Sequence, residues 1–162
     1  MNKTMHILCC AVLFAVMMGC GRNDSNTLSG SANLNGKIDG TDWLFQFGRA
    51  YKNSDGSWKV ALSDSSPTSG NPCDLFWIPE GWQVYIGAKN MHSRDFKFDW
   101  GSEQSASLVR IGKQTGNYSA QIQLLKGNGS VESFENGTIT GNLDLKNDQV
   151  ELKGRFTATV CN

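Results

Sequence analysis

The chain has 162 residues, and its 15 basic and 15 acidic side chains give a formal net charge of zero. This length suits one domain with a hydrophobic core of its own. The sequence contains no cluster of Lys and Arg, so a nucleic-acid partner is not expected. After residue 20 no apolar run approaches the about 20 residues that a membrane-spanning helix needs.

The first 20 residues have the layout of an export signal. Residues 1–6 are polar and include Lys3, residues 7–18 are apolar, and Gly19 precedes Cys20. A charged start, a short apolar run and a small residue before the cut are typical of a secretory signal peptide. The sequence therefore predicts that residues 1–19 are removed on export.

The segment Met17-Met18-Gly19-Cys20 resembles the lipobox of bacterial lipoproteins, in which Gly or Ala precedes the lipidated cysteine. The resemblance implies a thioether-linked diacylglycerol on Cys20, an acylated amino terminus and attachment to a membrane. Gly21 stands where Asp would imply retention in the inner membrane, so the resemblance implies the outer membrane, facing the periplasm or the cell surface. Met17 and Met18 depart from the favoured residues. The alternative is an ordinary signal peptide cut nearby, with Cys20 a free thiol.

Residues 20–33 are expected to be the lipidated cysteine and a flexible tether, because Gly, Asn, Ser and Thr dominate this stretch. Thirteen such residues span about 20 Å as a random coil. That length is enough to lift a domain away from lipid headgroups. The remainder, residues 34–162, is expected to form a single β domain.

Cys73 and Cys161 are the other two cysteines of the expected mature chain. An exported chain with two such thiols most simply pairs them in a disulfide. A metal site and a catalytic thiol are the alternatives. The sequence lacks a CxxC spacing, and His92 is the single histidine after Cys20. We therefore expect a disulfide and no metal or other cofactor.

From residue 34 onward apolar and polar residues alternate with a period of two, which is typical of strands. In chain order we expect strands at residues 34–39, 42–52, 58–63, 75–78, 82–87, 95–100, 106–111, 117–125, 131–135, 139–145 and 150–160. Turn residues separate them, for example at 53–56, 127–130 and 146–148. About ten strands with such turns predict an all-β fold. An antiparallel β-sandwich and a closed β-barrel of about 8–10 strands both fit the pattern.

Two short segments support this fold class by resemblance. Gly36–Phe45, with the sequence GKIDGTDWLF, and Gly154–Cys161, with the sequence GRFTATVC, resemble small β-rich domains of bacterial lipoproteins of uncharacterised function. These motifs are signals for strands and turns. The resemblance therefore implies a fold and no particular chemistry.

Catalysis has little support in the sequence. His92 would have to serve as the base of a hydrolytic triad, and no GxSxG elbow is present. Asp95 and Asp99 share a strand face at about 13 Å, given ~3.3 Å per residue. Glycosidase carboxylates lie only about 5–9.5 Å apart. We therefore expect no enzymatic activity.

The aromatic residues offer a candidate binding surface. Four tryptophans fall on apolar strand faces and are expected in the core: Trp43, Trp58, Trp82 and Trp100. Tyr85 lies on the opposite face of its strand, and Trp77 lies in a strand that is apolar on both sides. We hypothesise that Tyr85 and Trp77 form a stacking platform for a sugar ring or a contact for a protein. The alternative is that Tyr85 packs under the loop that contains Cys73.

Taken together, these features predict a lipid-anchored bacterial envelope protein with a non-catalytic binding or structural β domain. A carbohydrate-binding module and a periplasmic inhibitor of a wall-degrading enzyme are the alternatives, with a glycan or an envelope protein as the partner. Exposed, clustered aromatic residues would favour the glycan. A rigid, projecting loop at residues 64–74 would favour inhibition, and a polar cleft holding His92 with a carboxylate would favour catalysis.

Overall fold

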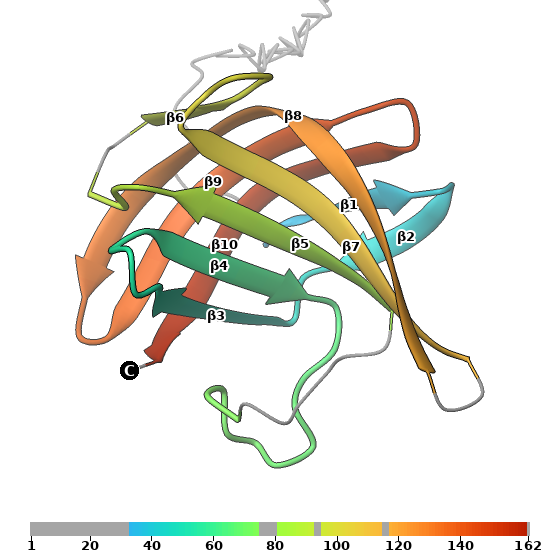
Figure 1. The fold of residues 1–162 in the computed structure, drawn as a ribbon, viewed down its shortest axis with the longest axis horizontal. Coiled ribbons are helices and arrows are strands. Elements are labelled where there is room, and N and C mark those ends of the chain that lie inside the picture. The colour runs from blue at the N-terminus through green and yellow to red at the C-terminus, as the bar shows by residue number, and fades with distance from the viewer. Residues whose placement is uncertain (1–32, 75–80, 93–94, 115–116, 162) are drawn as a thin grey trace, which may run out of the picture.

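The computed structural model describes residues 33–74, 81–92, 95–114 and 117–161 (Figure 1). Within these ranges the chain forms ten strands and no helix, which confirms the all-β prediction. The strands are β1 Asn35–Ile38, β2 Thr41–Leu44, β3 Phe47–Lys52, β4 Trp58–Ser63, β5 Gly81–Ala88, β6 Asp95–Phe98, β7 Gln104–Gln114, β8 Asn117–Glu135, β9 Thr138–Lys146 and β10 Val150–Cys161. The predicted strand at 75–78 lies outside the described residues.

Seven of the described strands close into a barrel, so of the two predicted architectures the chain adopts the barrel. The ring runs β3, β4, β5, β7, β8, β9, β10 and returns to β3 (Figure 1). Neighbouring strands are antiparallel except at the closure, where the end of β10 pairs with β3 in parallel. The β1–β2 hairpin adds to the start of β10, and β6 pairs with the part of β8 that extends past the start of β7.

Alternate residues of the strands fill the core. Val60 and Leu62 of β4 and Val84 of β5 are fully buried. The β1–β2 hairpin contributes to the same core, because Trp43 is only 2% exposed and donates a hydrogen bond of 3.1 Å from its indole nitrogen to the Trp82 carbonyl oxygen. Each large apolar side chain buried in this way contributes about 1.5–3 kcal/mol.

Close packing between β8 and β9 depends on glycine. Gly127 has φ of +143°, and a Cβ atom there would lie 2.0 Å from the Asp144 carbonyl oxygen. At Gly141 a Cβ atom would lie 2.1 Å from the Ser130 carbonyl oxygen. The sequence prediction of a turn at 127–130 is therefore wrong. The glycines of this segment do not end the strand. They let β8 continue as one long strand that bends against β9.

Two other predicted strands differ from the structure, because one is interrupted and one ends early. The strand predicted at 42–52 is interrupted at Phe45 and Gln46. The Phe45 amide bonds to the carbonyl oxygen of Leu34, which directly precedes β1, whereas the Gln46 amide bonds to the Ser63 carbonyl oxygen of β4. The chain therefore changes partner at this point. The strand predicted at 95–100 ends at Phe98.

The predicted disulfide between Cys73 and Cys161 is confirmed, with the two Cα atoms 5.4 Å apart. It ties the segment 64–74, which we call the Cys73 loop, to the end of β10. Arg49 of β3 fixes the same loop by donating a hydrogen bond of 2.9 Å to the Asp74 carbonyl oxygen. The loop is therefore held at its carboxyl end from two neighbouring strands.

Removal of the disulfide should destabilise the barrel strongly. The bond joins residues 88 positions apart, and the chain-entropy estimate for such a loop is about 4–5 kcal/mol. We expect the double variant Cys73→Ala/Cys161→Ala to lose a free energy of unfolding of that order in urea denaturation. Reductant should lower the stability of the native chain and leave the variant unchanged. Equal stability of the two proteins under oxidising conditions would contradict this role.

A side chain at Gly141 should also destabilise the fold. The nearest atoms belong to the β8 backbone and to the Phe156 ring, so Gly141→Ala forces the strands apart at a cost of about 1–3 kcal/mol. Gly112→Ala is the matched control, because its Cβ would meet only the Ser119 hydroxyl, at 3.5 Å. Urea denaturation should separate the two variants. Equal destabilisation would show that the close approach of β8 and β9 is unimportant.

Candidate functional site

Tyr85 lies on the outer face of β5, as the alternation predicts, and borders a shallow hollow of about 260 Å³. Its hydroxyl donates a hydrogen bond of 2.9 Å to Gln83 Oε1, and Lys59 Nζ lies 4.8 Å from the ring centre. Burial raises the pKa of the hydroxyl above its ordinary value, and nearby Tyr51 adds to this effect. The ring is therefore half-buried with a cation over it, and its predicted partner Trp77 lies outside the described residues.

Trp100 is the exposed aromatic residue that the sequence pattern placed in the core, and that prediction is wrong. Phe96 and Phe98 are buried as expected, but Trp100 is 80% exposed. The strand stops because residues 99–103 form a turn, which we call the Trp100 turn. In it the Ser102 amide bonds to the Asp99 carbonyl oxygen, and the Trp100 amide bonds to Asp99 Oδ1 at 2.8 Å.

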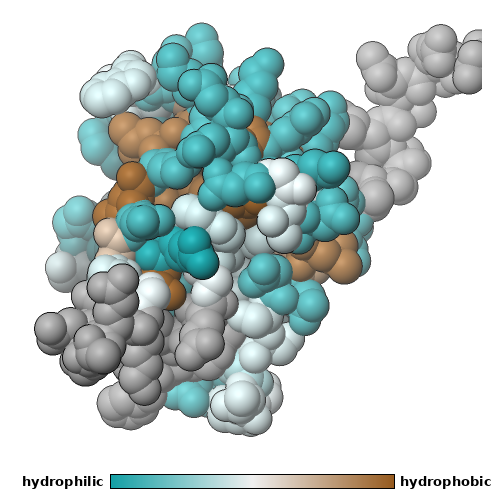
Figure 2. All heavy atoms as spheres, turned by 90° about the vertical axis from the view of Figure 1, so that its right-hand side faces the viewer, coloured by the Kyte–Doolittle hydropathy of each residue, from teal (hydrophilic) through white to brown (hydrophobic). Residues whose placement is uncertain are grey.

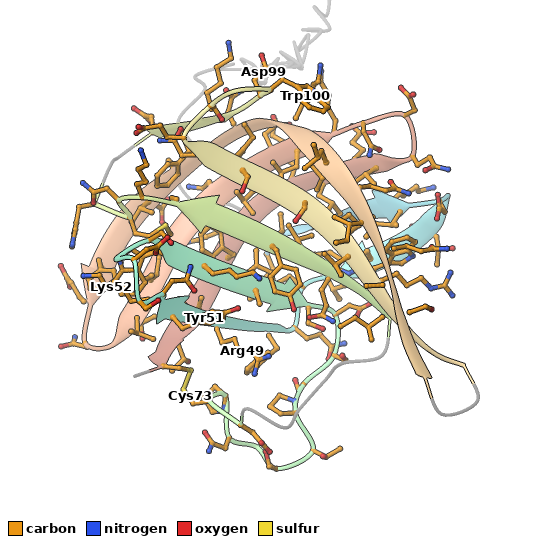
Figure 3. The ribbon with its side chains drawn as sticks, viewed as in Figure 1. Arg49, Tyr51, Lys52, Cys73, Asp99 and Trp100 are labelled. Atoms are coloured by element: carbon orange, nitrogen blue, oxygen red, sulfur yellow. A yellow bond between two sulfur atoms is a disulfide. The ribbon has the colours of Figure 1, made fainter. Side chains whose placement is uncertain are left out.

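Trp100 stands at the rim of a hollow of about 170 Å³ between this turn and β8, which we call the Trp100 hollow. Lys126 Nζ lies 3.9 Å from Asp99 Oδ1 at its edge. Both side chains are largely exposed, so their pairing contributes at most about 1 kcal/mol and both groups stay available to a ligand. The remaining polar lining comes from Ser102, Gln104 and Ser105. Figure 3 shows Asp99 and Trp100 at the end of the barrel opposite Cys73.

Apolar side chains also reach the surface on the outer face of β8. Ile122 is 67% exposed and Leu124 is 53% exposed, and Leu124 lines the Trp100 hollow. These two residues are two positions apart on β8 and therefore project from the same face, which is the outer one. Figure 2 shows apolar patches between polar residues on the side of the molecule that lies at the right in Figure 1. The apolar rim of the hollow therefore extends from Trp100 onto β8.

A larger groove of about 570 Å³ crosses the outer face of β8, β9 and β10. We call it the asparagine groove, because its lining includes Asn35, Asn128 and Asn142 together with Asp95, Ser130, Asp144 and Lys153. Asn142 Nδ2 donates to Glu132 Oε1 at 2.6 Å, whereas Oδ1 of the same amide is buried and has no partner among the described residues. A buried acceptor without a partner costs about 1–3 kcal/mol.

Among the described residues, the His92 side chain contacts an aromatic ring. The His92 ring packs edge-on against Phe134, with the ring centres 5.1 Å apart. Over the described ranges, no group of three or more His, Cys, Asp or Glu side chains could hold a metal ion. The same ranges contain no helix long and apolar enough to cross a membrane.

The Cys73 loop projects from the end of the barrel away from the Trp100 turn (Figure 1). Besides the disulfide and Arg49, internal hydrogen bonds hold it: the Gly70 amide bonds to the Pro67 carbonyl oxygen at 3.0 Å, and the Asp74 amide to the Asn71 carbonyl oxygen at 3.2 Å. Burial raises the pKa of Asp64, at the start of the loop. The disulfide and these hydrogen bonds together hold the loop in place.

The sequence contained a signal for the Trp100 turn that the alternation masked. Asp99 and Ser102 are turn-forming residues, and Gly101 between them takes φ of +80°, a conformation that favours glycine. The segment Asp-Trp-Gly-Ser is therefore turn chemistry that follows directly on an alternating strand. Weighing the glycine above the alternation would have placed Trp100 outside the core.

Comparison with known proteins gives no assignment for this arrangement. No protein-family model, no curated protein and no solved structure matches the chain. The resemblance to lipid-anchored β-rich domains stays a prediction from the sequence. The function is therefore argued from the barrel and the side chains on its surface.

Proposed function

We propose that the chain is a lipid-anchored protein of the bacterial envelope whose barrel binds a glycan, without catalysis, through the Trp100 hollow. The observation that carries the proposal is Trp100 itself, whose indole is held out of the core by a turn and is 80% exposed. Aromatic side chains have a large apolar surface that stabilises a protein when buried. An indole kept in water beside a hollow is therefore available for a partner.

The polar groups around the indole support a sugar as that partner. A sugar ring has an apolar face of C–H groups and a rim of hydroxyls. The indole offers a flat apolar surface for the face, while Asp99, Gln104 and Lys126 offer an acceptor, an amide and a donor for the rim. Binding sites commonly combine an apolar surface with a few polar groups that fix orientation. The Trp100 hollow replaces the Tyr85–Trp77 platform in this proposal.

The anchor supports the same assignment. Cys20, lipidated as the resemblance implies, lies 13 residues before Asn33, where the described chain begins. Two or more acyl chains hold a protein stably on a membrane. A short polar tether of about 20 Å then keeps the barrel close to the envelope glycans. The outer membrane, with the barrel in the periplasm or on the cell surface, is the proposed location.

Inhibition of a wall-degrading enzyme is the second candidate function, and the Cys73 loop is the observation that favours it. The disulfide and the hydrogen bond from Arg49 to Asp74 hold the loop in place. A loop that is ordered before binding loses little conformational entropy on docking into an enzyme cleft. If the full chain slowed a wall hydrolase and binding were lost in loop variants alone, this function would replace the first.

Replacement of Trp100 should abolish glycan recognition. On a glycan array and in titration calorimetry, we expect Trp100→Ala to weaken binding about tenfold or more, because it removes the stacking surface. Trp100→Phe should retain part of the affinity. Leu44→Ala is the control, because it removes an exposed apolar side chain from β2. In the sheet, β1, β10 and β9 lie between β2 and β8, the strand that borders the Trp100 hollow. Absence of any glycan ligand on the array would refute the proposal.

Lipidation is tested in cells that express the full-length chain. Growth with an alkyne-labelled fatty acid should label the protein and place it in the membrane fraction. Cys20→Ser should remove the label, whereas Cys73→Ala, which affects only the disulfide, should keep it. An unlabelled full-length protein would exclude the anchor and leave the barrel a secreted domain.

A further inference from the structure

We infer that the Trp100 hollow and the asparagine groove are two parts of one extended site, and that its ligand is an oligosaccharide rather than a single sugar. This inference rests on the proposed function of Trp100 and adds the class and length of the ligand. It uses the asparagine groove of about 570 Å³, to which neither the sequence nor the comparisons assign a role.

The outer face of β8 connects the two hollows. Lys126 lines the first, and Asn128 and Ser130 line the second. Alternate residues of a strand project from the same face, at about 6.6 Å per two residues. Lys126 of the Trp100 hollow and Asn128 of the asparagine groove are therefore adjacent on the outer face of β8.

Strand β6 and the Trp100 turn follow the same path beside β8. Asp95 lies opposite Ser130 in the register of the two strands, and Phe98 lies opposite Gly127. The chain then enters the Trp100 turn, where Asp99 pairs with Lys126 at 3.9 Å. Trp100 therefore stands at one end of a track whose other end opens into the asparagine groove.

The dimensions exceed those of one sugar ring. From Lys126 to Ser130 the track is about 13 Å long at 3.3 Å per residue. From Asn128 within this track the groove crosses Asp144 of β9 and Lys153 of β10 to Asn35 of β1, as the register of these strands sets. Three strand spacings of about 4.8 Å add roughly 14 Å in that direction. A ligand that contacts both Trp100 and Asn35 must therefore be a chain of several units.

The lining of the groove indicates a ligand rich in hydroxyl and amide groups. Its charged groups largely compensate one another, since Lys153 pairs with Asp144 at 2.9 Å. The remaining recognition falls to asparagine amides, each of which both donates and accepts hydrogen bonds. The buried Oδ1 of Asn142 lacks a donor among the described residues, so the lining of the groove retains an unused hydrogen-bond acceptor. Sugars that carry N-acetyl groups fit this lining.

Titration of the full-length protein in detergent with N-acetylglucosamine and its linear oligomers of increasing length tests the inference. We expect affinity to rise with length by about tenfold or more over the monomer, and then to level off when the groove is filled. Trp100→Ala should weaken binding at every length, because it removes the stacking end of the site.

Asn128→Arg separates the extended site from the hollow alone. Asn128 is an exposed residue at the entrance of the groove, so the longer side chain fills the path without entering the core. We expect the long oligomers to fall to the affinity of the monomer while monomer binding is unchanged. Asp148→Arg, in the exposed turn before β10, is the matched control and should bind like the native protein.

Two outcomes overturn the inference. If the oligomers bind no more tightly than the monomer while Trp100→Ala still abolishes binding, the ligand site is the hollow alone and the proposed function stands. If Asn128→Arg binds long oligomers as well as the native protein and has an unchanged unfolding midpoint, the groove takes no part. A glycan array without any ligand would remove the proposed function itself.

Discussion

The barrel depends on the pairing of β10, because both edges of this strand have partner strands. One edge pairs with β9 from Glu151 to Thr159. The other edge pairs with β1 at its start and, in parallel, with β3 at its end. Closed sheets avoid free edges, which otherwise invite pairing with other chains. The disulfide at Cys161 fixes this closure at the point where the chain ends its last strand.

The candidate site lies on the outside of the barrel, because the inside is filled. Buried apolar side chains from all around the ring occupy the interior. The candidate site instead uses a turn inserted between β6 and β7, together with the outer face of β8. Glycines on the inward side of β8 make that face possible. A Cβ atom at Gly129 would lie 2.9 Å from Leu143 and 3.0 Å from Phe98, so the absence of a side chain lets three strands pack closely beneath the groove.

The alternation of apolar and polar residues was enough to predict the fold class, most strands and the outward position of Tyr85. The disulfide was predicted separately, from the two cysteines that follow Cys20. The alternation could not place Trp100, because a strand that ends in a turn continues the alternation for two residues. Nor could it find the asparagine groove, whose residues come from five strands and meet only through the register. The alternation of apolar and polar residues distinguishes the two faces of a strand. It does not predict which strands become neighbours in the sheet.

The parallel closure between β10 and β3 joins the last strand of the chain to one that precedes it by about a hundred residues. Contacts so distant in sequence form late in folding, because the intervening loop must be closed first. The antiparallel pairs from β3 to β9 join strands close in sequence and can form without β10, whereas the ring cannot close before β10 is present. If the chain is exported as proposed above, closure of the barrel would wait until β10 has emerged on the far side of the membrane.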